Sequence, residues 1–207
     1  MKRRVYLDHL SGGPLAPEVS AAMSPWLDEI HGNAASLHRH GLKAREALDT
    51  AAAQCAAMIG APADDLVFTS SGTEANNLAV KGVAEAQRER GTHLILSNIE
   101  HPSIDQSVAW LEQQGFTATR VPVDREGRLS VGAVMEAITE KTILIATHHA
   151  NHDLGTVQNL PALGALAGER GIPLLIDATT SGGWLPVDVT AYSISLLTLA
   201  PHRFGGP

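Results

Sequence analysis

Short apolar runs alternate with amphipathic segments through most of the chain. The runs predict strands at residues 66–69, 93–97, 118–122, 142–147, 173–176 and 193–199. Helical periodicity lies between most of them, at residues 74–88, 104–114, 131–139 and 160–170. Two of the strands, at 143–146 and 174–176, are apolar throughout, which is typical of a parallel sheet covered by helices on both faces. The pattern therefore predicts an α/β fold with a mainly parallel sheet.

The first 60 residues lack this alternation of strand and helix. Their pattern predicts one helix over residues 16–30 and a second over 40–59, which Gly60 ends. We therefore expect residues 1–60 to form an N-terminal arm with helices, and residues 61–207 to form the α/β domain.

Composition narrows the class of protein. The chain has 207 residues, with 15 Lys and Arg against 22 Asp and Glu, a net charge of −7. No run of Lys or Arg could neutralise a row of phosphates, so we expect no nucleic-acid partner. The sequence contains no stretch of about 20 apolar residues, which is the length needed to span a membrane. The single cysteine, Cys55, cannot form an internal disulfide, which is typical of a reducing compartment and favours a cytoplasmic protein.

In open parallel sheets, ligands bind beyond the carboxyl ends of the strands. After the strand at 66–69, small and hydroxyl residues, Gly72 and Thr73 among them, lead directly into the helix expected at 74–88. Free N–H groups and the helix dipole at such a junction favour an anion, which predicts a phosphate site. The alternative, which the spacing alone favours, is an ordinary N-cap formed by Ser or Thr.

Other polar residues follow the next strands. His101 comes after the strand at 93–97, and Asp177 ends the strand at 173–176. A carboxylate at the end of a buried strand needs a partner, either a cationic heterocyclic nitrogen or a donor from a neighbouring loop. Three histidines and an aspartate lie within residues 148–153, which leaves a metal-binding module as an alternative.

Together these segments resemble the class V aminotransferase family of pyridoxal-phosphate enzymes, and in particular the cysteine desulfurases. The motifs that carry the resemblance are Tyr6-Leu7-Asp8, residues 32–38, residues 71–77, Glu100-His101, residues 151–155 and Asp177-Ala178-Thr179. The resemblance implies the large domain of the PLP-dependent transferase fold, like that of aspartate aminotransferase, with only the N-terminal part of the family present.

The resemblance also implies a cofactor, pyridoxal 5′-phosphate (PLP), and residues that hold it. Those residues are Gly72, Thr73, His101, His152, Asp177, Thr180, His202 and Arg203. His101 would lie against the pyridine ring and act catalytically as a proton carrier, and Asp177 would pair with the ring nitrogen so that the ring accepts electrons. Thr180 replaces a family glutamine and His152 replaces a family asparagine, and both can still form hydrogen bonds.

The main departure from the family is Arg203. Where the family has Ser-Gly-His-Lys, with the lysine as the Schiff-base residue, this chain has Ala200-Pro201-His202-Arg203. A guanidinium stays protonated at physiological pH and cannot act as the amine nucleophile. The cofactor is therefore expected to be held noncovalently or lost.

The expected function follows from both the resemblance and the departures. The family moves sulfur from L-cysteine to an acceptor, in sulfur metabolism and iron–sulfur cluster assembly. Without the lysine, and without the C-terminal domain that carries the family's catalytic cysteine, we expect this chain alone to be inactive and to be a subunit, a fragment or a pseudoenzyme. Expected partners are a second copy in a homodimer or a complementing chain, and a sulfur-acceptor protein. The alternative is a His-rich metal-binding or scaffold protein.

Overall fold

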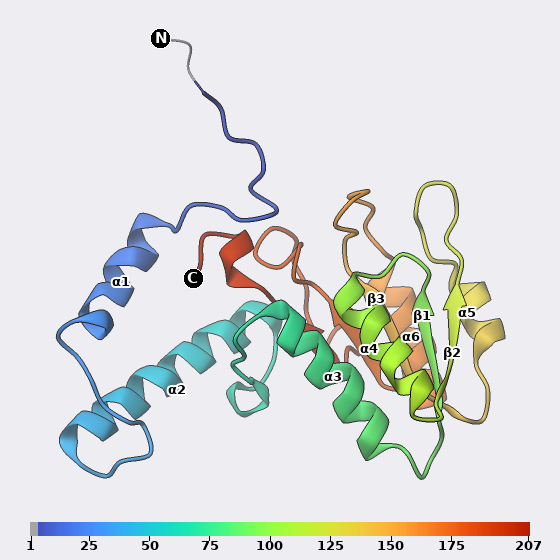
Figure 1. Ribbon diagram of the computed structural model, residues 1–207, viewed down its shortest axis with the longest axis horizontal. Coiled ribbons are helices and arrows are strands. Elements are labelled where there is room, and N and C mark those ends of the chain that lie inside the picture. The colour runs from blue at the N-terminus through green and yellow to red at the C-terminus, as the bar shows by residue number, and fades with distance from the viewer. Residues whose placement is uncertain (1–3) are drawn as a thin grey trace. The chain divides into compact units, whose positions relative to one another are not determined.

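The computed structural model describes residues 4–207 and divides the chain into two compact units (Figure 1). The first unit runs to Phe68 and includes Pro201–Pro207, and the second is Thr69–Ala200. The division therefore falls eight residues after the expected boundary at residue 60. The expected domains, an arm over residues 1–60 and an α/β domain over 61–207, stay predictions.

The second unit is built on one five-stranded sheet. Its strands are β1 (His93–Ser97), β2 (Thr117–Val121), β3 (Thr142–His148), β4 (Leu174–Asp177) and β5 (Leu196–Thr198). Their order is β2-β1-β3-β4-β5, and every pair is parallel. The predicted parallel α/β architecture is confirmed.

Helices cover the sheet of this unit on both faces. They are α3 (Gly72–Ala86), α4 (Pro102–Gln113), α5 (Val131–Ala137) and α6 (Leu160–Arg170). Figure 1 shows α3 and α4 in front of the strands, and their apolar side chains form one core with Leu94, Leu144 and Leu175. Neighbouring residues of the same strands point to the opposite face, where α6 packs on β4. The carboxyl ends of the strands are thus held at one edge of a rigid core.

The predicted strand at residues 66–69 is wrong. Leu66 is extended, but residues 66–69 belong to no ladder among the described strands, and Val67 and Phe68 are more than half exposed. Strand propensity alone forms no strand without a neighbouring backbone to pair with. β5 is also shorter than the predicted strand at 193–199, because Ser193 has a positive φ of 50° and turns the chain before the strand begins.

The first unit contains helices α1 (Pro17–Leu27) and α2 (Arg39–Ile59) and the short 3-10 helices η1 (Ala63–Asp65) and η2 (Pro201–Arg203). As predicted, α2 ends at Gly60, which adopts the left-handed conformation with φ of 69°. Backbone N–H groups of Gly13 and Ala16 donate to carbonyls within 202–205, which joins the two ends of this unit.

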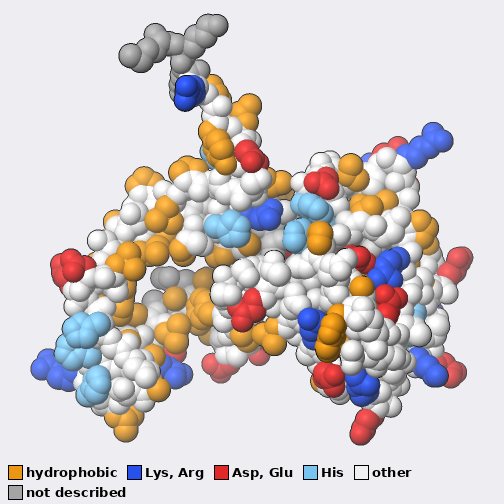
Figure 2. Space-filling model, in the orientation of Figure 1, with side chains coloured by type: hydrophobic (Ala, Val, Ile, Leu, Met, Phe, Trp, Pro, Cys, Tyr) orange, Lys and Arg blue, Asp and Glu red, His pale blue; other side chains and the backbone are white. Residues whose placement is uncertain are grey.

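The first unit exposes many hydrophobic side chains. α1 buries no residue, and Figure 2 shows hydrophobic side chains at the surface along α1 and α2. Leu27, Leu37 and Leu42 are all more than half exposed. Cys55 lies in α2 as a half-buried free thiol, so it is less buried than a core residue. Within residues 4–207, no helix has the length and apolarity needed to cross a bilayer.

Candidate functional site

Asp177 is the last residue of β4 and is almost fully buried, with 3% of its surface exposed. Its Oδ1 accepts a hydrogen bond from the backbone N–H of Thr179 at 2.9 Å. Its Oδ2 accepts from the side-chain amide of Asn76 at 2.8 Å. Both oxygens are therefore acceptors, as an ionised carboxylate requires, and each keeps a lone pair for a further donor.

The N-terminus of α3 provides an anion-binding backbone. Ser71 is the N-cap, and its hydroxyl accepts from the N–H of Glu74 at 3.1 Å. The Glu74 carboxylate in turn accepts from the hydroxyl and the N–H of Ser70, and these bonds lower the pKa of Glu74. The N–H groups of Gly72 and Thr73, the first two residues of the helix, have no acceptor within it. The N-cap that we considered as an alternative is present, and it leaves the predicted phosphate-binding groups available.

Gly72 packs directly against the segment that follows Asp177. A Cβ atom at Gly72 would lie 2.8 Å from Cγ2 of Thr179 and 3.6 Å from Cβ of Ala200. A Cβ atom at position 72 would therefore force the Thr179 side chain or its surroundings to shift. The close approach places the helix N-terminus beside the strand that carries Asp177.

His101 is the N-cap of α4. Its Nδ1 lies 3.1 Å from the backbone N of Ser103 and 2.7 Å from the Ser103 hydroxyl oxygen. Its ring meets the ring of His152 edge to face, with the centroids 5.2 Å apart. Thr180 donates its hydroxyl to the carbonyl of Ala150 at 2.8 Å, so it is engaged with backbone rather than free to turn.

The structure thus places six of the predicted site residues in the second unit: Gly72, Thr73, His101, His152, Asp177 and Thr180. His202 and Arg203 belong to the first unit, in η2. Their roles at the cofactor stay predictions.

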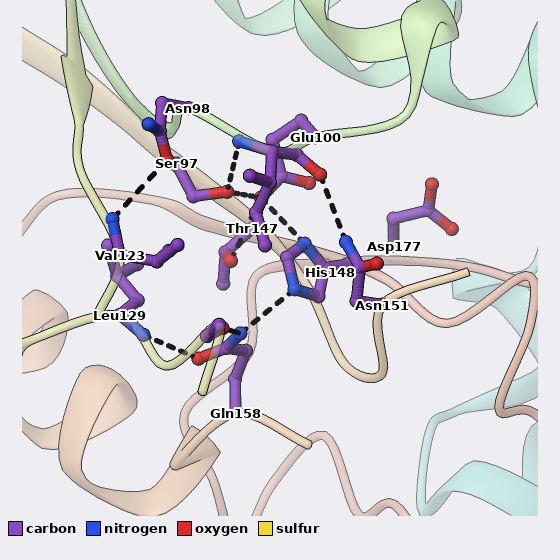
Figure 3. Close-up of polar contacts among 12 residues, drawn as sticks. Ser97, Asn98, Glu100, Val123, Leu129, Thr147, His148, Asn151, Gln158 and Asp177 are labelled. Atoms are coloured by element: carbon purple, nitrogen blue, oxygen red, sulfur yellow. Dashed lines mark hydrogen bonds and ion pairs between the residues drawn. The ribbon is translucent and has the colours of Figure 1, made fainter. Parts of the chain in front are cut away.

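A buried polar cluster supports the turn that presents His101 (Figure 3). The side chain of Glu100 is fully buried, and its Oε1 accepts from the hydroxyls of Ser97 and Thr147 and from Nδ1 of His148. The Oε2 atom of Glu100 is buried with no partner among the described residues. These bonds tie the turn after β1 to the end of β3.

Gln158 fixes the proton position on His148. Its Oε1 accepts from the N–H of Leu129 and its Nε2 donates to the carbonyl of Gly127, so the amide orientation is set by backbone. The remaining amide hydrogen then donates to Nε2 of His148 at 2.9 Å. His148 is therefore neutral and carries its proton on Nδ1, which donates to Glu100.

The histidines that suggested a metal site have separate roles. His148 bonds to Glu100, and His149 lies 3.0 Å from the hydroxyl of Ser181. Burial, and secondarily the neighbouring His148, lowers the pKa of His149. Within the described residues, no three side chains of metal-ligand type are grouped to hold an ion. The geometry does not support the metal-binding alternative.

Comparison with known proteins places this geometry in a family. The model of the family "Aminotransferase class-V" matches residues 5–207. The chain belongs to the class V aminotransferase family. It is 42% identical to the cysteine desulfurase IscS of Dictyoglomus turgidum over all of this chain and 52% of that protein. It is 40% identical to the IscS of Methanosarcina thermophila over 99% of this chain and 51% of that protein.

Solved structures agree with the sequence comparison. A protein named SspA, solved in complex with cysteine, superposes with a TM-score of 0.94 at 37% identity. That match covers 98% of this chain and 58% of the SspA chain. The chain spans about half the length of the curated relatives it matches. The resemblance to cysteine desulfurases and the fold it implied are confirmed.

Sequence reasoning gave no role to several residues that support the site: Asn76, Glu100, Ser103 and Thr198. One signal was available for Asn76, which shares the buried stripe of α3 with Ala79, Val80 and Ala84. A polar residue on an apolar helix face needs a buried partner. The partners themselves lie as far as 122 residues away and could not be read from the sequence.

Proposed function

We propose that this chain keeps a PLP site of the cysteine desulfurase type but does not by itself remove sulfur from cysteine. The observation that carries the proposal is the packing of Gly72 on Thr179, beside the buried carboxylate of Asp177. It supports one site with an anion-binding end and a carboxylate end, which are the two groups that a phosphorylated pyridine needs.

The residues of the second unit fit this cofactor. Gly72 and Thr73 would hold the phosphate through their N–H groups, and the Thr73 hydroxyl is exposed for a further bond. Asp177 would accept from the protonated ring nitrogen with a lone pair that no donor among residues 4–207 uses. His101 would lie at the ring. When bound, the cofactor supplies an electron sink for a carbanion next to the amino group of the substrate.

Covalent attachment does not fit position 203. Arg203 stands where the family has its lysine, and a guanidinium cannot add to the aldehyde of the cofactor as an amine does. None of the described lysines takes the place of the family lysine at position 203. Lys43 lies in α2, Lys81 lies in α3, and Lys141 immediately precedes β3. We therefore propose noncovalent binding of the cofactor, with the chain serving as one part of a larger assembly.

Retention of the cofactor tests this proposal. The chain is mixed with PLP, treated with borohydride or left untreated, and passed over a desalting column. We expect the untreated chain to bind PLP reversibly and the treated chain to carry no covalent adduct by mass spectrometry. The variant Arg203→Lys is expected to gain one adduct, whereas Arg125→Lys, at an exposed position, gains none. Absence of binding by both the parent chain and Arg203→Lys would refute the cofactor site.

A second copy of this chain is the partner we propose. Leu27 of α1 and Leu42 of α2 are more than half exposed on the first unit, and exposed apolar side chains of this kind favour a protein interface. Light scattering during gel filtration is expected to give a dimer, and Leu27→Glu with Leu42→Glu to give a monomer. A monomeric parent chain would contradict this and favour a complementing chain or a sulfur-acceptor protein on this surface.

A further inference from the structure

A buried chain of hydrogen bonds connects Asp177 to His101. It passes through Asn76 of α3 and Ser103 of α4, which are 1% and 7% exposed. Asn76 Nδ2 lies 2.8 Å from Oδ2 of Asp177 and 2.9 Å from the hydroxyl oxygen of Ser103. The Ser103 hydroxyl is in turn 2.7 Å from Nδ1 of His101. Residues from three elements, β4, α3 and α4 with its N-cap, thus meet within one unit.

The direction of each bond is determined by its neighbours. An ionised Asp177 can only accept, so the NH₂ group of Asn76 and not its carbonyl must face it. The second hydrogen of that NH₂ group donates to Ser103. The carbonyl oxygen of Asn76 accepts from the hydroxyl of Thr198 at 2.7 Å. All hydrogen-bonding groups of the amide are used, so the amide has one orientation.

The same reasoning fixes the proton on His101. The backbone N–H of Ser103 donates to Nδ1 of His101 at 3.1 Å, so this ring atom is an acceptor. The Ser103 hydroxyl, whose oxygen accepts from Asn76, therefore donates its own hydrogen to the same Nδ1. A nitrogen that receives two donors carries no proton, so a neutral His101 holds its hydrogen on Nε2.

We propose that Asn76 is a positioning residue that couples Asp177 to the proton position on His101. The carboxylate orients the amide, the amide orients the Ser103 hydroxyl, and the hydroxyl keeps Nδ1 as an acceptor. The proposal rests on the proposed function only in taking Asp177 and His101 as the groups that face the cofactor. Its consequence is that the two ends of the ring site do not set their protonation independently.

The test uses the ¹⁵N-labelled 207-residue chain without cofactor. Long-range ¹H–¹⁵N imidazole spectra report which ring nitrogen carries the proton, and His101→Gln assigns the His101 signals. We expect the parent chain to show the Nε2–H form, and Asp177→Ala to move the Nδ1 resonance toward that of a mixed tautomer. In a Ser103→Ala background, the same substitution is expected to cause a shift several-fold smaller.

Ser107→Ala is the matched control. Ser107 is a buried serine of the same helix, and its hydroxyl donates to the carbonyl of Ser103 rather than to the chain of bonds. In a Ser107→Ala background, Asp177→Ala is expected to shift the Nδ1 resonance of His101 as much as it does in the parent chain. An equal shift with and without the Ser103 hydroxyl, or no shift in the parent chain, would overturn the proposal.

A folding defect does not prevent the test. If Asp177→Ala gives no folded spectrum, Thr198→Val removes the donor to Asn76 with little change of volume, and the same criteria apply. Because no cofactor is present, a failure of PLP binding leaves this result unaffected.

Discussion

Nδ1 of His148 donates to Oε1 of Glu100 across 2.9 Å, and both side chains are buried. Glu100 immediately precedes His101, whereas His148 ends β3. The contact therefore ties the turn that carries His101 to the strand next to it. A buried carboxylate with three donors on one oxygen makes this turn sensitive to change at Glu100.

Glu100→Ala is expected to lower the free energy of unfolding by about 3 kcal/mol or more, because it leaves three buried donors without an acceptor. Glu100→Gln keeps one accepting oxygen, so its cost is expected to be about half as large. Urea unfolding followed by circular dichroism measures both. The exposed Glu126→Ala serves as the control and is expected to change stability by less than about 0.5 kcal/mol. Equal and small losses for both Glu100 variants would contradict this assignment.

Gly72→Ala tests the close approach at the N-terminus of α3. The added methyl group would lie 2.8 Å from Cγ2 of Thr179, so we expect a loss of about 1–3 kcal/mol in stability and weaker PLP binding. Thr179→Ser removes that methyl group and keeps the N–H that donates to Asp177. The double variant is therefore expected to recover most of both losses. Thermal unfolding and a PLP titration check this. If the double variant recovers neither stability nor PLP binding, the contact with Thr179 is not the cause of the losses.

The isolated chain is expected to form alanine from L-cysteine no faster than free PLP does. The reason is Arg203, whose guanidinium stays protonated and cannot serve as the amine nucleophile. Alanine is measured by mass spectrometry in the presence of PLP, with Cys55→Ser as a control for reactions of the only thiol. Alanine formation well above the free-cofactor rate would show that the chain is active alone.

The sequence predicted the parts of the fold that depend on local pattern. β1 and α6 have the predicted bounds, because β1 is a short apolar run and α6 has clear end signals, Asn159 before it and Gly171 after it. The segment 66–69 has the composition of a strand but pairs with none of the described strands, and composition cannot supply a partner. Family motifs predicted roles at the cofactor for Asp177 and Gly72, and these roles stay predictions. The motifs did not reveal Asn76 as the link to His101, because that contact depends on three elements meeting in space.

Stability of the chain is expected to fall as the pH drops below about 6.5. Burial lowers the pKa of His93 and of His149 from the ordinary value of 6.5, so both rings take up protons less readily in the folded chain than in the unfolded chain. As the pH falls through 6.5, the unfolded chain takes up protons that the folded chain does not, which favours unfolding. The contribution of the two neutral rings to stability is fully present above their pKa in the unfolded chain. It is lost as the pH falls from that value toward their lower pKa values in the folded chain.

His93→Gln separates this effect from other titrations. The ring of His93 lies 2.8 Å from the hydroxyl of Thr142 and 2.9 Å from that of Thr119, and glutamine can bond to hydroxyls without titrating. Urea midpoints at pH 5.5 and 7.5 are compared for the parent chain and for His93→Gln. We expect a smaller difference between the two pH values in the variant, since one of the two protonation sites is gone. An unchanged difference would mean that His93 titrates alike in the folded and unfolded chain.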